Sequence, residues 1–365
     1  MPARRRILFV SAHPRGFAPS QRFRFEQYVD FLAEHGFDTT FSPVVRPEEY
    51  PLLYAPGNVR RKAKIFTRGL AQRLAQSLRG TDADIAIVQR EAIQLGTTVF
   101  ESALARSRAK LVFDFDDAIW LADTSPANRR MSWLKRPGKV PRLIELADQV
   151  WAGNAYLAGY ARRFNSHIEL VPTTVDTDRH CPSAQRSTDH AVCLGWTGSP
   201  STLKHFELVV PVLRRLRDRY GDGISFKVIG DGGYRQDDLG ITGTPWREET
   251  EVADLSSIDI GLMPLPDDEW AKGKCGLKAL QFMAMELPVV TSPVGVNTEI
   301  IDDGGNGYLA ADDDDWFTRL AALIESDELR RSVGRAARQT VIERYSVASQ
   351  RERYLTLLSS LSSRN

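Results

Sequence analysis

The sequence predicts an α/β protein made of two doubly wound domains that face each other across a cleft. Short apolar runs alternate with segments of helical periodicity, which is typical of parallel sheets covered by helices. A polar stretch near residue 180 interrupts this alternation, which then starts again. A length of 365 residues, 42% of them hydrophobic, suits two cores of ordinary size.

The first domain is expected over residues 1–178. It opens with a strand, a helix and a strand, the unit from which parallel sheets are built. The helix is expected in "QRFRFEQYVDFLAEHGF", where apolar residues recur at helical spacing and Gly36 provides a stop. The strands are expected in "RILFVSAH", "DTTFSPVV", "ADIAIVQR", "AKLVFDF", "DQVWAGN" and "IELVPTTV".

A polar linker is expected over residues 179–190, and the second domain over residues 191–346. Its strands are expected in "AVCLGWTG", "ISFKVIGDGG", "SSIDIGLMPL" and "PVVTSPVG", and its first helices in "STLKHFELVVPVLRRLRDRY" and "GLKALQFMAMEL". Two helices close this domain, and a last helix within residues 347–365 is expected to pack back on the first domain. Because ligands bind outside the carboxyl ends of strands in such sheets, the cleft is the expected site.

The composition excludes several classes of protein. Three scattered cysteines, Cys181, Cys193 and Cys275, favour neither a disulfide framework nor a zinc site, and six histidines show no metal-ligand spacing. The first apolar run is too short for a signal peptide, and no segment has the roughly 20 apolar residues of a membrane span. We therefore expect a cytoplasmic protein with no metal, no other cofactor and no nucleic-acid partner.

Charge is distributed unevenly along the chain. Residues 1–180 contain 27 Lys and Arg against 19 Asp and Glu, whereas the remaining residues contain 21 against 28. This asymmetry is consistent with an anionic partner or membrane surface on one side, or with uneven solvated charge. Residues 58–80 predict a basic amphipathic helix, which either lies on the anionic inner face of a membrane or is simply solvated.

The segment "KCGLKALQFMAMELPVV" is nearly apolar, but Lys274, Lys278 and Gln281 recur in it at spacings of four and three. On one helix these positions form a narrow polar stripe. Two lysines there would attract an anion, and Gly273 and Gly276 would let its phosphates approach backbone amides. The alternative is a buried helix whose lysines extend into solvent.

The longer segment "KCGLKALQFMAMELPVVTSPVGVNTEII" resembles the donor-binding region of retaining glycosyltransferases of the GT-B fold, in the group-1 superfamily and family-4-like. The matching residues are Gly276, Met283, Ala284, Leu287, Pro288, Val289, Val290, Gly295, Glu299 and Ile300. "VIGDGG", "IDIGLMPL", "DDGGNGYLA" and "LVPTTVDTDRHCP" are similar to further motifs of that family, so nearly all of the chain fits.

The resemblance implies two Rossmann-like domains and transfer of a sugar from a UDP- or GDP-sugar to a hydroxyl acceptor with retention of anomeric configuration. It also implies a metal-independent mechanism and an acceptor that is lipid-linked or a saccharide, as in the building of cell-envelope polysaccharide or glycolipid. Together with the local patterns, it selects the donor-binding residues Gly198, Ser199, Lys204, Gly230, Asp231, Lys274, Cys275, Gly276, Leu277, Lys278, Gln281 and Glu299.

The sequence departs from the family at the paired glutamates, whose positions are occupied by Gly273 and Gln281. A glutamine can still hydrogen-bond the ribose but brings no charge. The loop containing Gly198, Ser199 and Lys204 lacks the family's arginine and instead offers amides and hydroxyls at a helix start. Its alternative interpretation is an ordinary helix cap with an exposed lysine.

"VFDFDDAIW" places three carboxylates at a strand end. Asp114 and Asp116 resemble the DxD motif of metal-dependent glycosyltransferases, and Asp114 resembles the nucleophile of haloacid-dehalogenase phosphatases, although Ala118 stands where that family has threonine. In the GT-B resemblance Asp116 and Asp117 lie at the cleft, where Asp116 would bind a sugar hydroxyl or orient the acceptor. Alternatively, these residues cap a helix.

The loop after the first strand supplies the remaining candidates. Gly16 would allow close approach of a substrate, Arg22 would bind a phosphate through paired hydrogen bonds, and His13 is the weakest of the three. Two other functions of the same fold stay open. One is a non-hydrolysing nucleotide-sugar epimerase, and the other is a catalytically silent nucleotide-sugar-binding protein.

Overall fold

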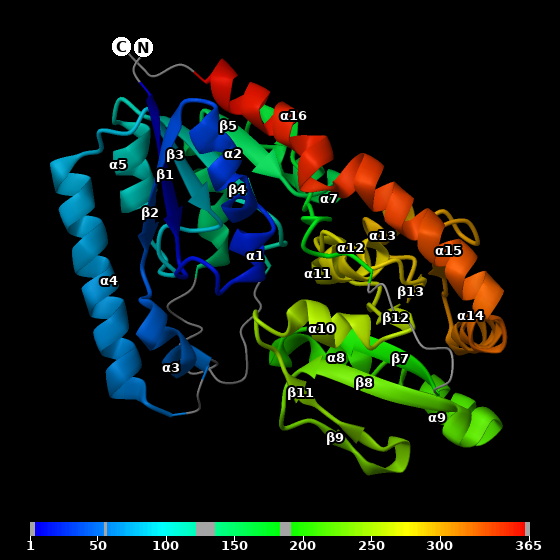
Figure 1. Cartoon of the computed structure of the whole chain (residues 1–365). Helices are drawn as coiled ribbons and strands as arrows, with labels where there is room; N and C mark the ends of the chain where they lie inside the picture. The colour runs from blue at the N-terminus through cyan, green and yellow to red at the C-terminus, as the bar shows by residue number, and fades with distance from the viewer. Residues whose placement is uncertain (1–3, 55–56, 122–135, 183–190, 362–365) are drawn as a thin grey trace. The chain divides into compact units, whose positions relative to one another are not determined.

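In this computed structural model the chain forms two compact units, each built on its own sheet (Figure 1). Unit 1 contains residues 1–173 and 351–365, and unit 2 contains residues 174–350, so the chain passes between them twice. The described residues are 4–54, 57–121, 136–182 and 191–361. The expected linker over 179–190 lies largely outside them.

Unit 1 contains a parallel sheet of six strands in the order β2-β1-β3-β4-β5-β6. The strands are β1 (Arg5–Ser11), β2 (Phe37–Pro43), β3 (Ile85–Gln89), β4 (Lys110–Phe115), β5 (Gln149–Ala152) and β6 (Ile168–Leu170). All five residues of β3 are buried, as expected for a central strand covered on both faces. The strand order reverses direction between β1 and β3, which makes their carboxyl ends the ligand-binding position of this sheet.

The helices of unit 1 are short except for α4. They are α1 (Pro19–Arg22), α2 (Val29–Glu34), α3 (Tyr50–Tyr54), α4 (Val59–Arg79), α5 (Val99–Ala105), α6 (Val140–Leu146), α7 (Ala155–Ala161) and most of α16 (Val347–Ser360). The single helix predicted before β2 was wrong: α1 and α2 are separate. Arg24, between them, pairs with the buried Asp114, and Phe25 stacks on Phe9 at 4.5 Å, so tertiary contacts override helix propensity there.

The C-terminal helix α16 is part of the core of unit 1. Tyr354 is 3% exposed and stacks on Tyr28, with ring centroids 4.3 Å apart, and its ring also contacts Trp151 at 4.9 Å. Arg5 of β1 donates a hydrogen bond of 3.0 Å to the carbonyl oxygen of Leu358. Residues from the two ends of the sequence therefore stabilise the same unit.

Unit 2 contains a second six-stranded parallel sheet, in the order β11-β8-β7-β12-β13-β14. Its strands are β7 (Val192–Thr197), β8 (Ile224–Gly230), β11 (Thr244–Pro245), β12 (Ile260–Met263), β13 (Val289–Thr291) and β14 (Tyr308–Leu309), with a separate hairpin of β9 (Arg235–Gln236) and β10 (Ile241–Thr242). The strand order reverses between β7 and β12, so their carboxyl ends are the expected ligand position.

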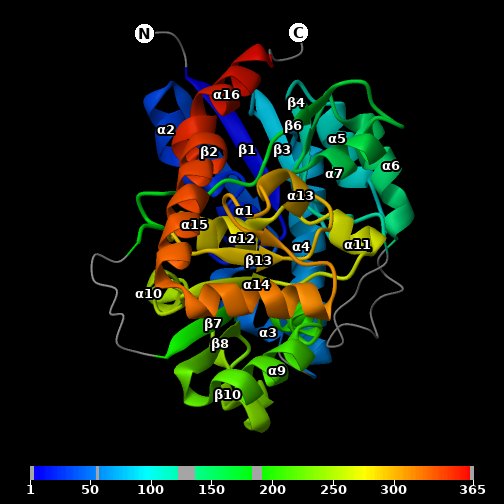
Figure 2. The same cartoon turned by 90° about the vertical axis from the view of Figure 1, so that its right-hand side faces the viewer.

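The helices of unit 2 cover both faces of this sheet, and Figure 2 shows α14 beside β13. They are α8 (Leu203–Phe206), α9 (Val210–Tyr220), α10 (Glu251–Ser256), α11 (Glu269–Lys272), α12 (Leu277–Ala284), α13 (Asn297–Ile300), α14 (Asp313–Glu325) and α15 (Asp327–Thr340). The single helix predicted over 201–220 was also wrong, because Pro211 lies in the first turn of α9, where its missing N–H is tolerated.

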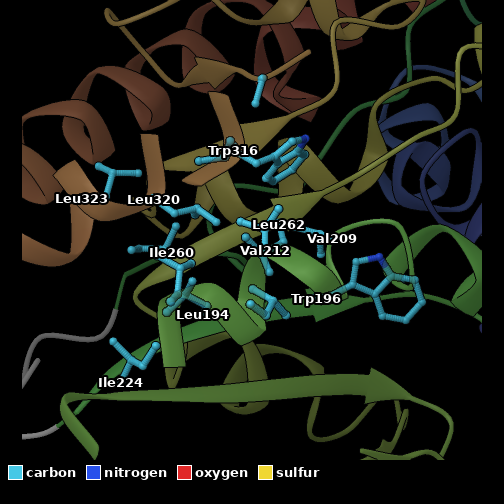
Figure 3. Packing of buried hydrophobic residues seen from close by; sticks show 14 of the residues in the cluster. Leu194, Trp196, Val209, Val212, Ile224, Ile260, Leu262, Trp316, Leu320 and Leu323 are labelled. Atoms are coloured by element: carbon cyan, nitrogen blue, oxygen red, sulfur yellow. The ribbon is translucent and has the colours of Figure 1, made fainter. Parts of the chain in front are cut away.

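The core of unit 2 joins the central strands to their covering helices (Figure 3). Leu194 of β7 and Leu262 of β12 pack with Val212 of α9 and Leu320 of α14, and all four side chains are at most 1% exposed. This packing fixes the ends of β7 and β12, from which the candidate site extends. Among the described helices, none combines the length and apolar character that a membrane span requires.

Candidate functional site

Two of the predicted glycines lie together where β7 and β8 end. The backbone N–H of Gly198 donates to the carbonyl oxygen of Ile229 at 2.9 Å, and Gly230 has a φ of +142°. A Cβ atom on Gly230 would overlap the carbonyl oxygen of Gly198, so only glycine fits there. The two strand ends therefore approach closely and leave bare backbone at the edge of the sheet.

The loop after Gly198 presents a cluster of hydroxyl groups. The side-chain oxygens of Ser199 and Ser201 lie 2.9 Å apart, and Thr202 Oγ1 donates to the Ser199 carbonyl at 3.0 Å. Thr202 Oγ1 also accepts a 3.3 Å hydrogen bond from Lys278 Nζ. The following helix, α8, has only four residues, so its dipole contributes little and the charge for binding an anion has to come from side chains.

The predicted lysine stripe is only partly helical. Lys278 and Gln281 lie on α12, but Lys274 precedes the helix, because Gly276 adopts a left-handed φ of +72° before α12 begins at Leu277. That part of the prediction was wrong. Both lysines are nevertheless half-buried against tryptophan rings: Lys278 Nζ lies 4.5 Å from the ring centroid of Trp196, and Lys274 Nζ 5.1 Å from that of Trp270.

The positive charges of three lysines act on the buried imidazole of His205. Burial and, to a smaller extent, the positive charges of Lys278, Lys274 and Lys204 together lower the pKa of His205 to about 4, with Asp268 opposing them. Three lysines that come from two separate segments therefore act on one side chain just beyond β7. Lys204 itself is exposed on α8. Such a concentration of positive charge is suited to an anion.

Gln281 belongs to a buried polar network that the sequence did not predict. It is 4% exposed, and its Nε2 donates to Glu251 Oε1 at 3.1 Å. Trp246 Nε1 donates to the same oxygen at 3.0 Å, and His180 Nε2 lies 3.8 Å from the other oxygen of Glu251. A carboxylate from α10 thus contacts the position at which the resembled family has a glutamate.

The remaining donor candidates have more local roles. The side chain of Asp231 accepts a 2.8 Å hydrogen bond from the N–H of Gly233, as in a tight turn. Cys275 is buried, and its sulfur lies 3.8 Å from the carbonyl oxygen of Gly273. Leu277 begins α12, and Glu299 is exposed on α13.

In unit 1 the two predicted catalytic carboxylates are both bound by Arg90. Arg90 Nε donates to Asp116 Oδ1 at 2.7 Å, and a terminal nitrogen of Arg90 donates to Asp117 Oδ2 at 2.6 Å. Gln89 adds a 3.3 Å hydrogen bond to Asp116. Arg90 directly follows β3, and the two carboxylates directly follow β4. Because neighbouring parallel strands end at the same edge of a sheet, the contact between Arg90 and these carboxylates could have been predicted from the sequence.

The loop after β1 lies near this cluster. Burial and, to a smaller extent, the charge of Arg90 together lower the pKa of His13 to about 4. The backbone N–H of Gly16, which has a φ of +87°, donates to a carboxylate oxygen of Glu26 at 2.8 Å. Arg22 is buried, with its guanidinium 5.0 Å from the ring centroid of Phe23.

The DxD-like pair does not present two open carboxylates. Asp114 is 2% exposed, and both of its oxygens accept hydrogen bonds from Arg24. Burial raises the pKa of Asp114, and Arg24 opposes this effect. Within the described part of the chain, no cluster of three or more His, Cys, Asp or Glu side chains has the arrangement of a metal site.

Two Rossmann-like units, each with polar residues at the ends of its strands, are the architecture of the GT-B fold. Two solved structures share this fold over nearly the whole chain. Sucrose-phosphate synthase from Thermosynechococcus elongatus has a TM-score of 0.71 at 13% identity, covering 98% of this chain and 99% of that one. Anabaena Alr3699/HepE in complex with UDP and glucose has a TM-score of 0.67 at 14% identity, covering 98% and 100%.

Residues 190–326, in unit 2, match the family model described as glycosyl transferases group 1. A similar relative is D-inositol 3-phosphate glycosyltransferase from Corynebacterium jeikeium, which is 27% identical over 199 residues, 47% of this chain and 46% of the relative. The chain spans about half the length of the D-inositol 3-phosphate glycosyltransferases that it matches. The predicted GT-B fold is therefore confirmed, and the predicted group-1 resemblance is confirmed over residues 190–326.

Proposed function

We propose that this protein transfers a sugar from a nucleoside-diphosphate sugar to a hydroxyl group of an acceptor. The observation that carries the proposal is the convergence of Lys204, Lys274 and Lys278 on the buried His205 at the carboxyl end of β7. A diphosphate bound there would neutralise charge that the fold has concentrated. The match of residues 190–326 to the glycosyl transferases group 1 model and the UDP and glucose bound in the Anabaena structure support the same conclusion.

The lysines would act mainly when the sugar leaves the diphosphate. Negative charge then grows on the phosphate oxygens, and preorganised ammonium groups stabilise it without any rearrangement. Lys278 is held by Thr202 and the Trp196 ring, so its position is set before the ligand arrives. This supports a metal-independent transfer. We propose in addition that the transfer retains the anomeric configuration and that a donor phosphate oxygen takes the acceptor proton.

The carboxylates of unit 1 would contact the sugar or the acceptor. Asp116 and Asp117 are 12% exposed at their side chains, and Arg90 holds both. A carboxylate held in this way accepts a hydrogen bond from a substrate hydroxyl at little entropic cost. In unit 2 the contact between Gln281 and Glu251 supports an active enzyme over a silent relative, because it brings a carboxylate back to a position where the family's glutamate is missing.

The proposal predicts that Lys278→Met and Lys274→Met each weaken binding of a nucleoside-diphosphate sugar about tenfold or more, because a charge-assisted hydrogen bond contributes about 1.5–3 kcal/mol. Calorimetry with UDP-, GDP- and ADP-sugars measures this. Lys227→Met is the matched control. Lys227 lies on β8, and its ammonium group donates to the side chains of Asp254 and Ser257. Unchanged affinity in both variants would remove the lysines from the site.

Analysis of the products separates the remaining functions. Transfer to a hydroxyl acceptor, persisting in EDTA, is expected for the proposed enzyme. Interconversion of two nucleotide-sugars would identify an epimerase, binding without turnover a silent protein, and loss of activity in EDTA a metal-dependent transferase. The anomeric configuration of the product, determined by NMR, tests retention.

We also propose that α4 lies on an anionic membrane surface, where the protein would meet a lipid-linked acceptor from the cytoplasmic side. The helix carries seven Lys or Arg and no Asp or Glu. Its outward face combines basic residues such as Arg60 and Lys64 with Leu74 (45% exposed) and Leu78 (88% exposed). Positive charge beside exposed leucines is the pattern of an interfacial helix.

A further inference from the structure

The segment that follows β3 forms no helix or strand, yet a buried lysine holds its backbone. Lys139 is 7% exposed, and its ammonium group donates to the carbonyl oxygens of Ile93 (3.0 Å), Leu95 (2.5 Å) and Thr97 (3.5 Å). It also lies 3.1 Å from the carboxylate of Glu91. One ammonium group therefore donates to every second carbonyl of this segment.

Further side chains fix the same segment. Arg73, which is 2% exposed, donates from Nε to the carbonyl oxygen of Ala92 at 2.8 Å, and Glu101 accepts from the N–H of Ala92 at 2.9 Å. The stem of Arg136 packs so closely over Gly96 that a Cβ atom there would overlap it. Buried charges are retained only where they are paired or hydrogen-bonded, so this arrangement specifies one conformation of the segment.

The residue directly before this segment is Arg90, which has a left-handed φ of +60°. A non-glycine residue pays about 1 kcal/mol for this conformation and keeps it only where its surroundings impose it. The conformation accompanies the contacts of the Arg90 guanidinium with Asp116 and Asp117. The fixed segment and the carboxylate cluster therefore meet at a single strained residue.

We propose that Lys139 is a positioning residue: by holding the segment after β3, it keeps Arg90 on Asp116 and Asp117. Lys139 touches neither carboxylate and acts only through the backbone. The proposal rests on the proposed function in one respect, namely that the carboxylate cluster serves the transfer reaction.

Lys139→Ala tests this in the full-length protein, with Lys110→Ala as the control, since Lys110 pairs with Asp148 at the opposite end of β4. The donor is the nucleotide-sugar that the wild-type protein binds. We expect kcat for transfer from this donor to fall roughly tenfold to a hundredfold, because small misplacements of active-site groups reduce rates by this much. KM for that donor should change less than about twofold, because the donor lysines lie in unit 2. Ammonium chloride should restore part of kcat by occupying the vacated carbonyls, whereas sodium chloride should not.

A second readout needs no activity. The charge of Arg90 helps to lower the pKa of His13 to about 4, so release of Arg90 should raise that pKa, as measured by NMR titration of the imidazole. Lys139→Met keeps the apolar stem and serves if the alanine variant does not fold. A wild-type His13 titration, or wild-type kcat, would overturn the role of Lys139. A shifted His13 titration in a protein without transfer activity would uphold that role and overturn the proposed function.

Discussion

At the scale of single residues, the pKa of His205 reports the positive charge at the proposed donor site. Its imidazole is 3% exposed and has no hydrogen-bond partner for Nδ1 among the described residues. Protonating it would place a fourth positive charge among three lysines. The side chain therefore stays neutral in the folded protein at a pH where the unfolded chain is protonated.

This depressed pKa predicts a loss of stability in acid. The unfolded chain binds the His205 proton near pH 6.5 and the folded protein only near pH 4, so the contribution is present above pH 6.5 and is lost as the pH falls towards 4. His205→Gln should remove this part of the acid sensitivity in urea unfolding at pH 7 and pH 4.5. His35→Gln, at an exposed position, is the control, and equal acid sensitivity of both variants would refute the prediction.

Residue identities were predictable where backbone chemistry determines them. Gly198, Gly230 and the three lysines near His205 were all named from local motifs, and the structure brings the glycines together and the lysines near His205. Their role in donor binding stays a prediction. Arg90, Glu251 and Trp196 were not, because their roles depend on contacts with residues 26 to 82 positions away, such as Gln281 for Glu251, Asp116 for Arg90 and Lys278 for Trp196. Local sequence patterns do not contain that information.

At the scale of elements, the close approach of the ends of β7 and β8 positions the backbone of the proposed donor site. Gly230→Ala should push the Gly198 loop away, because the new Cβ atom would meet backbone and not a flexible side chain. We expect a loss of about 1–3 kcal/mol in the free energy of unfolding, together with weaker nucleotide binding. Thermal unfolding and calorimetry measure the two effects.

Gly223→Ala is the matched control for that change. Gly223 lies at the other end of β8, and a Cβ atom there would meet nothing within 4 Å. If both variants behaved alike, close approach of the two strand ends would not be the reason for glycine at position 230.

The central strands of both sheets were predicted well and the helices less well, whereas the short edge strands β11 and β14 and the β9–β10 hairpin were not predicted. Apolar runs identified the strands because both faces of each sheet are covered. Two long predicted helices were divided by Pro211 and by the burial of Arg24 and Phe25. A third boundary moved because Gly276 turns the chain through a left-handed conformation, which left Lys274 outside α12.

At the scale of the whole molecule, the uneven distribution of charge leads to a test of the proposed membrane contact. The first 180 residues carry the positive excess, and α4 concentrates it on one helix. In flotation assays we expect binding to vesicles containing phosphatidylserine and little binding to neutral vesicles, with release at high salt.

Replacing Arg60, Arg61, Lys64 and Arg79 by glutamine should abolish that binding, at about 1 kcal/mol for each charge. These four side chains lie on the exposed surface of α4. Glutamine at Arg215, Arg219, Arg331 and Arg335 in unit 2 is a control with the same change in charge. Unchanged flotation of the variant with the four α4 substitutions would refute the proposal that α4 binds the membrane.

The placement of Trp196 has a practical consequence. Its indole is 1% exposed and lies under the ammonium group of Lys278, so its surroundings are rigid and its nearest charge is the one that we assign to the diphosphate. The protein thus contains an intrinsic fluorophore at the point of interest, and ligand titrations can be followed optically without any label.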